Sequence, residues 1–180
     1  MGAISLMNRR LGESYCERAI LADGTQVVLR PIRQEDGPLL QAGLLELSER
    51  TRYFRFHSPR KELSPEELSF LTEVDGESHF ALAALKLPAQ KLVAVGRWVR
   101  SKSEQGQAEI ALVVTDALQG RGLGQLLLSR LREAALERNV TRFTGSIIDE
   151  NRAIRGLLRK LGARIGLAFR GVCEIELALT

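Results

Sequence analysis

Three glycines at alternate positions, Gly120, Gly122 and Gly124, separate an apolar run from an amphipathic one. Glycine tolerates positive φ angles and places no Cβ between the backbone and a ligand. The first amides of a helix lack internal partners and lie at the positive end of the helix dipole. A turn of this kind is a ready site for phosphate oxygens, so the sequence predicts that these glycines bind an anion.

Glu109 is the second candidate for chemistry, because it is an acidic residue at the mouth of the apolar run Ile110 to Thr115. Burial of an unpaired carboxylate is costly, so Glu109 must be solvated, paired or retained for function. A strand-end carboxylate paired with an arginine such as Arg97 is the structural alternative. The residues alone leave both interpretations open.

Regular elements must position these residues. β-Branched residues between Ile110 and Thr115 predict a short strand closed by Asp116. After the glycines, Leu127 and Leu131 recur at the spacing of a helix with one buried face. The glycines therefore lie in a turn from strand to helix.

The spacing of the glycines distinguishes among known phosphate-binding turns. It does not fit the dinucleotide pattern G-x-G-x-x-G, and no Gly-Lys-Ser/Thr follows as in Walker A. Gln119, Gly122 and Gly124 fit Gln-x-x-Gly-x-Gly. With the preceding strand, this resembles the coenzyme A pyrophosphate loop of the GNAT superfamily of N-acetyltransferases. An ordinary tight turn between strand and helix is the alternative.

The resemblance implies a set of site residues. Glu109 corresponds to a general base, while the turn, the strand before it and an asparagine correspond to cofactor contacts. The implied contacts with acetyl-CoA or coenzyme A are Leu112, Val113, Val114, Gln119, Gly120, Arg121, Gly122, Leu123, Gly124 and Asn151. An N-cap role explains Asn151 equally well.

One position departs from the superfamily pattern. Many members have a tyrosine seven residues after the asparagine as general acid for the leaving thiol, and Leu158 stands there. Either the thiolate leaves unprotonated, or Tyr53 or Cys173 approaches from elsewhere. For Cys173 the sequence favours a small apolar residue in a closing strand over a reactive group.

Composition limits the function classes. The 180 residues are 44% hydrophobic and 27% charged, as in one globular domain, with a net charge of +4. This charge suits a polyanion such as coenzyme A, while the absence of a basic segment interleaved with aromatics makes nucleic acid the poorer partner. Two distant cysteines and two histidines give no metal motif. Without an export signal or a membrane-length apolar run, a cytoplasmic protein is expected, with a homodimer among the open possibilities.

The periodicity of the chain predicts one domain over residues 26–180, preceded by an N-terminal arm of unknown role over 1–25. The other expected elements are a strand over 26–33, helices beginning at Asp36, Ser48 and Ser64, strands over 79–87, 92–101 and 142–148, a helix capped by Asn151, and one or two closing strands. In the helix over 48–56, aromatic side chains are expected to pack inward and arginines to face solvent.

This order also resembles a GNAT domain, from about Gln26 to Leu179. The implied fold class is α/β (α+β), a mixed and mostly antiparallel central sheet flanked by helices and splayed at the strand before the glycine-rich turn. Segments 29–33, 52–56 and 108–111 are similar to GNAT domains that acylate protein lysines. The expected function is acetyl transfer from acetyl-CoA to a primary amine, with a protein lysine ahead of a small amine. The alternative is a non-catalytic acyl-CoA-binding regulatory or interaction module.

Three arginines of the last helix, Arg152, Arg155 and Arg159, share one face at three- and four-residue spacing. A solvated face is the default interpretation. An acidic partner or the 3′-phosphate of the cofactor is the alternative.

Overall fold

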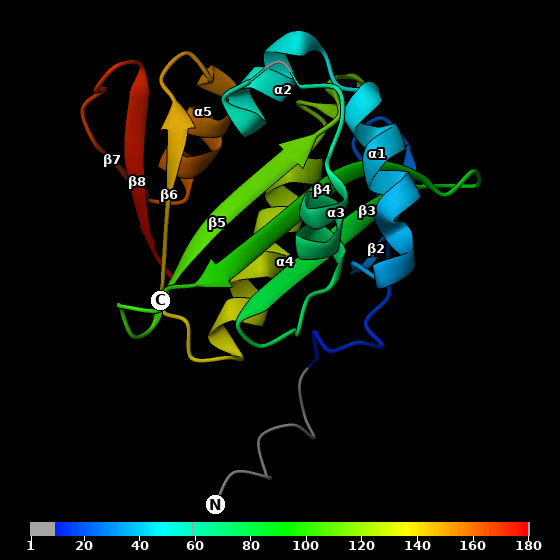
Figure 1. The fold of residues 1–180 in the computed structure, drawn as a ribbon, viewed down its shortest axis with the longest axis horizontal. Helices are drawn as coiled ribbons and strands as arrows, with labels where there is room; N and C mark the ends of the chain where they lie inside the picture. The colour runs from blue at the N-terminus through cyan, green and yellow to red at the C-terminus, as the bar shows by residue number, and fades with distance from the viewer. Residues whose placement is uncertain (1–9, 59, 180) are drawn as a thin grey trace, which may run out of the picture.

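One sheet of eight strands forms the centre of the molecule, in the order β1-β2-β3-β4-β5-β6-β8-β7 (Figure 1). The computed structural model describes residues 10–58 and 60–179. The strands are β1 (Glu17–Ile20), β2 (Gln26–Pro31), β3 (His79–Lys86), β4 (Lys91–Arg100), β5 (Gln107–Val114), β6 (Arg142–Ile148), β7 (Arg164–Ile165) and β8 (Val172–Ala178). Neighbouring strands are antiparallel except for β5 and β6, which run parallel. The predicted mixed, mostly antiparallel sheet is confirmed.

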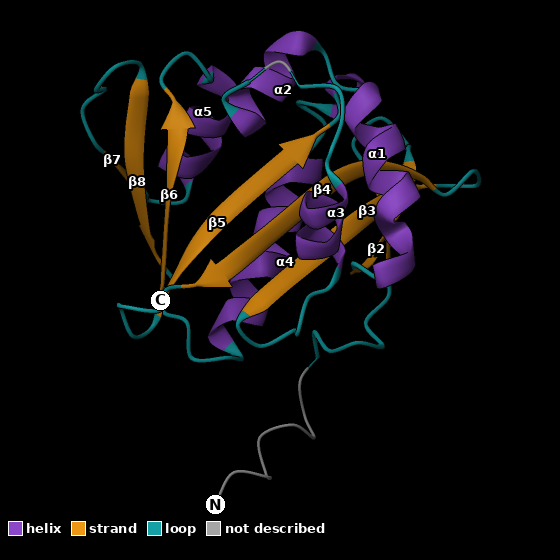
Figure 2. Cartoon of the chain, viewed as in Figure 1, coloured by secondary structure: helices purple, strands orange, loops and turns teal. Residues whose placement is uncertain are grey.

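Helices cover both faces of the sheet (Figure 2). They are α1 (Gly37–Leu45), α2 (Glu49–Phe56), α3 (Pro65–Thr72), α4 (Leu123–Leu136) and α5 (Arg152–Lys160), with 3₁₀ turns η1 (Gln34–Asp36) and η2 (Asp116–Leu118). Leu127 and Leu131 of α4 share one apolar core with Trp98, and Leu40 and Leu44 of α1 belong to a second core. Within the described residues, no helix combines the length and the apolar character needed to cross a bilayer.

The start of α3 follows from its first residues. The Glu67 amide donates a hydrogen bond to Ser64 Oγ, and the Ser64 amide donates one to the Glu67 carboxylate. Pro65 occupies the first helical turn, where its missing N–H has no bond to lose. The predicted start of a helix at Ser64 is confirmed, and this capping box fixes how the chain enters the helix layer over the second core.

Strands β5 and β6 part soon after they pair. Their register joins only three residues of each strand, Gln107 to Glu109 and Arg142 to Thr144. Beyond that point β6 is paired with β8, while β5 stays paired with β4 as far as Val114. Figure 1 shows the β6–β8 pair diverging from β5. The expected splay is present, and it leaves one edge of β5 without a neighbouring strand.

The residues before β2 contribute a strand that the sequence did not reveal. Strand β1 pairs with β2 at the edge of the sheet, and Leu11 is completely buried. Arg130 of α4 donates two hydrogen bonds to the carboxylate of Glu17 in β1, at 2.7 and 2.8 Å. Residues 17–20 are therefore part of the sheet. Residues 1–9 of the predicted arm lie outside the described residues.

In α2 the expected distribution of side chains is wrong for Arg52 and Tyr53, whereas Phe56 packs against the second core and Arg50 is exposed, as expected. Arg52 is 5% exposed, and its Nη1 donates a hydrogen bond to the Leu47 carbonyl at 2.6 Å. Tyr53, in contrast, is 46% exposed. The carbonyl of Leu47 lies just beyond α1, where backbone acceptors lack helical partners. Arg52 lies inside because the Leu47 carbonyl needs a hydrogen-bond donor. Hydrophobic periodicity does not predict a buried arginine.

Replacing Glu17 by Gln is expected to lower the free energy of unfolding by about 1–3 kcal/mol at pH 7, because the bond to Arg130 loses its charged acceptor. Hydrogen bonds from Arg130, opposed by burial and helped by Tyr15, lower the pKa of Glu17 from its ordinary value of 4.5 to about 2. The stabilisation is therefore complete above pH 4.5 and is lost as the pH falls towards 2.

Urea unfolding of Glu17→Gln and wild type at pH 7, 4 and 3 checks this, with the exposed Glu13→Gln as a control that should change little. A difference in unfolding free energy that is the same at pH 3 and pH 7 would contradict it.

Candidate active site

The glycine-rich turn follows β5 and η2 and leads into α4. Gly120 and Gly122 have φ angles of +73° and +89°, and nothing lies within 4 Å of the Cβ that either would carry. The amides of residues 120–125 have no hydrogen-bond partner among the described residues, and the Leu126 amide is the first to bond to a carbonyl of the turn, that of Gly122, at 3.0 Å. The turn therefore presents a row of free N–H groups at the positive end of α4. This geometry is typical of a phosphate site.

Contacts with α2 hold the turn in place. Asp116 accepts hydrogen bonds from the Ser48 amide at 2.9 Å, the Ser48 hydroxyl at 2.7 Å and the Thr51 hydroxyl at 2.7 Å. Gln119, predicted as a cofactor contact, donates from Nε2 to Thr51 Oγ1 at 3.3 Å and to the Val114 carbonyl at 3.0 Å. The side chain of Gln119 thus shapes the turn through contacts within the protein.

Three further residues of the turn that were predicted to contact the cofactor, Arg121, Leu123 and Gly124, have other neighbours within the protein. Arg121 forms an ion pair with Asp23 in the β1–β2 turn. Leu123 is completely buried in the core under α4. At Gly124 an added Cβ would lie 3.7 Å from Leu157 of α5, so this position sets how closely α4 and α5 approach. For Leu123 and Gly124 only the backbone amide is available to a ligand, whereas the side chain of Arg121, although paired with Asp23, is 42% exposed.

Strand β5 directs alternate backbone groups towards the splay. The Thr115 amide donates a hydrogen bond to the Val93 carbonyl, next to β4, at 2.9 Å. Because backbone groups alternate along a strand, Val113 also faces β4. Leu112 and Val114 direct their N–H and C=O groups to the side from which β6 has departed. Of the three predicted strand contacts, Leu112 and Val114 therefore lie at the open edge.

A cavity of about 360 Å³, here called the reaction cavity, lies between the parted strands. Glu109, the last residue of β5 paired with β6, is on its wall, and so is Asn151 at the start of α5. The Ile154 amide donates to Asn151 Oδ1 at 3.3 Å, so Asn151 also caps α5. The carboxylate of Glu109 is exposed and has no hydrogen bond or ion pair with any residue that the structure describes.

Arg97, the arginine suggested above as an ion-pair partner of Glu109, is hydrogen-bonded to other groups. Arg97 is 4% exposed, and its guanidinium donates to the Leu71 carbonyl at 3.2 Å and to His79 Nε2 at 3.0 Å. The ion pair between Arg97 and Glu109 is not formed. A carboxylate that is unpaired and open to a cavity is available to accept a proton.

Two residues of the reaction cavity were not expected there. Arg55 and His57, at the end of α2, line it together with Glu109. His57 ends the helix with a φ of 54°, which turns the chain out of α2. The only signal in the sequence was an arginine and a histidine among aromatic residues, and this pattern does not specify which way the side chains point.

Comparison with known proteins identifies the family. The model of the acetyltransferase (GNAT) domain matches residues 26–164, which is most of the chain. The chain belongs to the GNAT acetyltransferase family. Its family and fold are those of acyl-CoA-dependent N-acyltransferases, as the glycine turn and the order of elements had predicted.

Individual relatives support the same assignment. Acetyltransferase Pat of Mycolicibacterium smegmatis is 34% identical over 140 residues, which are 78% of this chain and 42% of Pat. Acetyltransferase PA5475 of Pseudomonas aeruginosa is 34% identical over 144 residues, 79% of this chain and 77% of that protein. The crystal structure of the GNAT domain of S. lividans PAT superposes with a TM-score of 0.82 at 26% identity, covering 91% of this chain and 96% of that one. The chain thus spans less than half the length of Pat.

Among the described residues of this GNAT domain, few other side chains could act as the general acid or bind a metal ion. Leu158 is 3% exposed and lines the reaction cavity from α5. Tyr53 is exposed on α2 and does not line that cavity, while Cys173 is completely buried in β8 and its Sγ donates to Asp149 at 3.3 Å. The expectation that Cys173 is a buried strand residue is confirmed. No group of three or more His, Cys, Asp or Glu side chains among the described residues could hold a metal ion.

The arginines of α5 border a second hollow in the GNAT domain, of about 820 Å³. Arg152, Arg155 and Arg159 line it from α5, and Arg50 lines it from α2. Arg155 forms an ion pair with Asp149. The predicted arginine face is confirmed. Asp149 and Glu150 also line the hollow, so four arginines against two acids leave a net charge of +2, which favours anionic over cationic ligands.

Replacing Gly122 by Ala is expected to weaken coenzyme A binding at least tenfold, because the added Cβ projects into the open space in front of the turn amides. The same change should lower the free energy of unfolding by about 1–2 kcal/mol, since a φ of +89° is strained for any residue with a Cβ. Isothermal titration calorimetry with coenzyme A and urea unfolding measure the two effects.

Gly76→Ala is the matched control, because Gly76 also has a positive φ, +70°, and nothing within 4 Å of an added Cβ. It should lower the free energy of unfolding by a similar amount and leave the affinity for coenzyme A unchanged. Wild-type affinity in Gly122→Ala would show that the phosphate site lies elsewhere.

Proposed function

We propose that this protein transfers an acetyl group from acetyl-CoA to a primary amine, a protein lysine ahead of a small amine, by direct attack in a ternary complex. One observation carries the proposal. The unpaired carboxylate of Glu109 and the unpaired amides of residues 120–125 lie at opposite ends of the same open edge of β5. From Glu109 to Val114 the strand rises about 17 Å, at about 3.3 Å per residue. The two groups are therefore spaced to hold the ends of an extended thioester.

Binding and orientation are assigned to the turn, the open edge and α5. The amides of residues 120–125 would hold the diphosphate of coenzyme A, and Leu112 and Val114 would pair with the pantetheine arm. Asn151 lies on the opposite wall of the cavity. Holding donor and acceptor in one cleft removes most of the entropic cost of bringing them together. The N–H of Leu112 faces the cleft, which makes it the candidate to polarise the thioester carbonyl.

Proton removal is assigned to Glu109. The attacking amine must be neutral, and Glu109 would take its proton directly or through one water. The N–C bond forms as the C–S bond breaks, and the electron pair leaves on the sulfur of coenzyme A. Because Leu158 cannot donate a proton, the thiolate is proposed to leave as an anion, which a thiol pKa of about 8.5 allows.

Support for a protein lysine as acceptor comes from the segments that resemble lysine-acylating domains. Two of these segments, 52–56 and 108–111, supply the cavity residues Arg55, Phe56 and Glu109. The residues that carry the resemblance therefore line the part of the cavity in which the acceptor amine would bind. The absence of a tyrosine at Leu158 motivates the alternative, a module that binds acyl-CoA without transferring the acyl group.

Replacing Glu109 by Gln is expected to lower the rate of acetyl transfer about 10²- to 10⁴-fold, because the amide cannot accept the proton of the amine. The affinity for acetyl-CoA should stay close to that of wild type, since Glu109 lies at the far end of β5 from the turn. Transfer to a panel of lysine peptides and small amines is read by mass spectrometry, and affinity is read by calorimetry.

Glu104→Gln, in the exposed turn before β5, is the matched control and should transfer at the wild-type rate. If wild type binds acetyl-CoA but acylates no amine in the panel, the binding module is the better description. If Glu109→Gln retains wild-type activity, another group is the base.

A further inference from the structure

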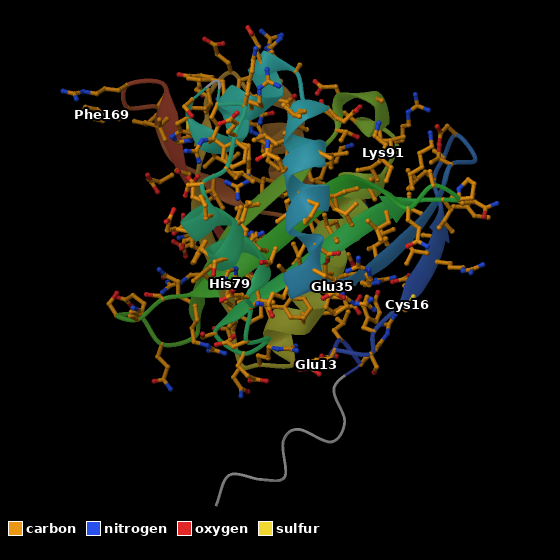
Figure 3. The ribbon with its side chains drawn as sticks, turned by 45° about the vertical axis from the view of Figure 1, so that its right-hand side comes forward. Glu13, Cys16, Glu35, His79, Lys91 and Phe169 are labelled. Atoms are coloured by element: carbon orange, nitrogen blue, oxygen red, sulfur yellow. The ribbon has the colours of Figure 1, made fainter. Side chains whose placement is uncertain are left out.

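Two arginines that form no ion pair with any described residue lie beside the reaction cavity. Arg97 is 4% exposed and donates to neutral groups, the Leu71 carbonyl and His79 Nε2. His79 lies at the start of β3 (Figure 3), and its ring packs against Phe70 of α3. It accepts this bond and is uncharged, since burial and the charge of Arg97 lower its pKa to about 4. In residues 10–58 and 60–179, no carboxylate lies within ion-pair distance of Arg97.

Arg55 is the second of these arginines. Its guanidinium carbon lies 4.9 Å from the centre of the Phe56 ring, and Arg55 has no hydrogen bond or ion pair with any described residue. Burial lowers the pKa of Arg55, and the charge of Glu109 opposes that shift. Burial and the charge of Arg55 in turn lower the pKa of Arg97 to about 9, which leaves Arg97 charged at neutral pH. An arginine side chain ordinarily stays protonated in proteins, so Arg55 is also treated as a cation.

Both arginines line a chamber of about 50 Å³ that adjoins the reaction cavity. Arg55 and Phe56 are on the wall of both spaces. Along β5, Ala111 lines the reaction cavity and Val113 lines the chamber. These two residues point to the same face of the strand, about 6.6 Å apart. The rest of the chamber wall is mostly leucine, from Leu40, Leu44, Leu47, Leu63, Leu71 and Leu92.

Charged groups with little access to water are normally paired, because the loss of hydration costs several kcal/mol. Among the residues that the structure describes, Arg55 and Arg97 line the chamber and no acid does, while Glu109, whose charge acts on Arg55, lies on the wall of the adjoining reaction cavity. An anion that entered the chamber would pair with both cations and would accept charge-assisted hydrogen bonds from Arg55. The leucines favour a ligand whose charge is carried on a short aliphatic stem. The chamber adjoins the place where the acyl group of the donor would lie.

We propose that this chamber binds the terminal carboxylate of a dicarboxylic acyl group, so that the protein accepts succinyl-CoA as a donor in addition to acetyl-CoA. The inference rests on the proposed function, because it places the acyl carbonyl beside β5. The chemistry of transfer is unchanged: the N–C bond forms, the C–S bond breaks, and the distal carboxylate stays intact and ionised. The aliphatic stem lies against leucine side chains, and the carboxylate is held by Arg55 at the entrance.

Butyryl-CoA is the matched comparison for succinyl-CoA, because its acyl chain has the same number of carbons and lacks the carboxylate. With one lysine peptide as acceptor, wild type should show at least tenfold higher kcat/KM for succinyl-CoA than for butyryl-CoA. Arg55→Gln should bring this ratio down at least tenfold, and Arg55→Lys should keep part of it. Arg18→Gln, an exposed arginine of β1 that lines none of the three cavities described above, should leave the ratio unchanged.

The ratio of kcat/KM for succinyl-CoA to kcat/KM for butyryl-CoA reports the effect of the carboxylate alone. A general effect of the substitution on transfer would change both values equally. A wild-type ratio at or below one, or a ratio that Arg55→Gln does not change, would overturn the inference even if acetyl transfer is fast. If no donor supports transfer, the proposed function fails, and the chamber is then judged by calorimetry alone. Succinyl-CoA must bind wild type more tightly than butyryl-CoA, and Arg55→Gln must abolish that difference.

Discussion

The parting of β5 from β6 is the constraint on which the rest of the structure depends. A strand that loses its neighbour exposes a row of N–H and C=O groups that require partners. Strand β5 tolerates this loss because its other edge is bonded to β4 along its length and its apolar side chains pack under α4. The open edge allows an extended ligand to pair with the sheet. It also places Glu109 where the two strands diverge, so its carboxylate reaches a cavity.

Charge is distributed unevenly around this parting. The amides at the start of α4 carry the positive end of the helix dipole. Arginines of α2 and α5 line the hollows on either side of α5, whereas Glu109 is the one acid on the wall of the reaction cavity among the described residues. An anionic cofactor and a cationic amine are therefore attracted to different parts of one cleft. Neither has to displace the other, as a ternary complex requires.

Sequence patterns that act within a few residues predicted most of the helices and strands. They did not predict which side chains line the inside of the site. Capping by Ser64 and the left-handed glycine at Gly122 mark helix starts in sequence, because both act within a few residues. Strands of four and two residues, β1 and β7, are too short for a periodic signal and depend on partners distant in the chain. The sequence placed Glu109 at the beginning of this strand, and in the structure it lies where β5 and β6 part. The inward direction of Arg52 and Arg55 depends on an unpaired carbonyl and on two adjoining cavities, which exist only after the chain has folded.

Asp116 connects the two halves of the site. Its carboxylate holds Ser48 and Thr51 in the first turn of α2, and Gln119 of the glycine turn bonds to the same threonine. The other end of α2 carries His57, on the wall against which an acceptor would rest. Helix α2 therefore joins the glycine turn at one end to the wall of the reaction cavity at the other. A change at the single carboxylate of Asp116 should consequently disturb both the proposed donor site and the proposed acceptor site.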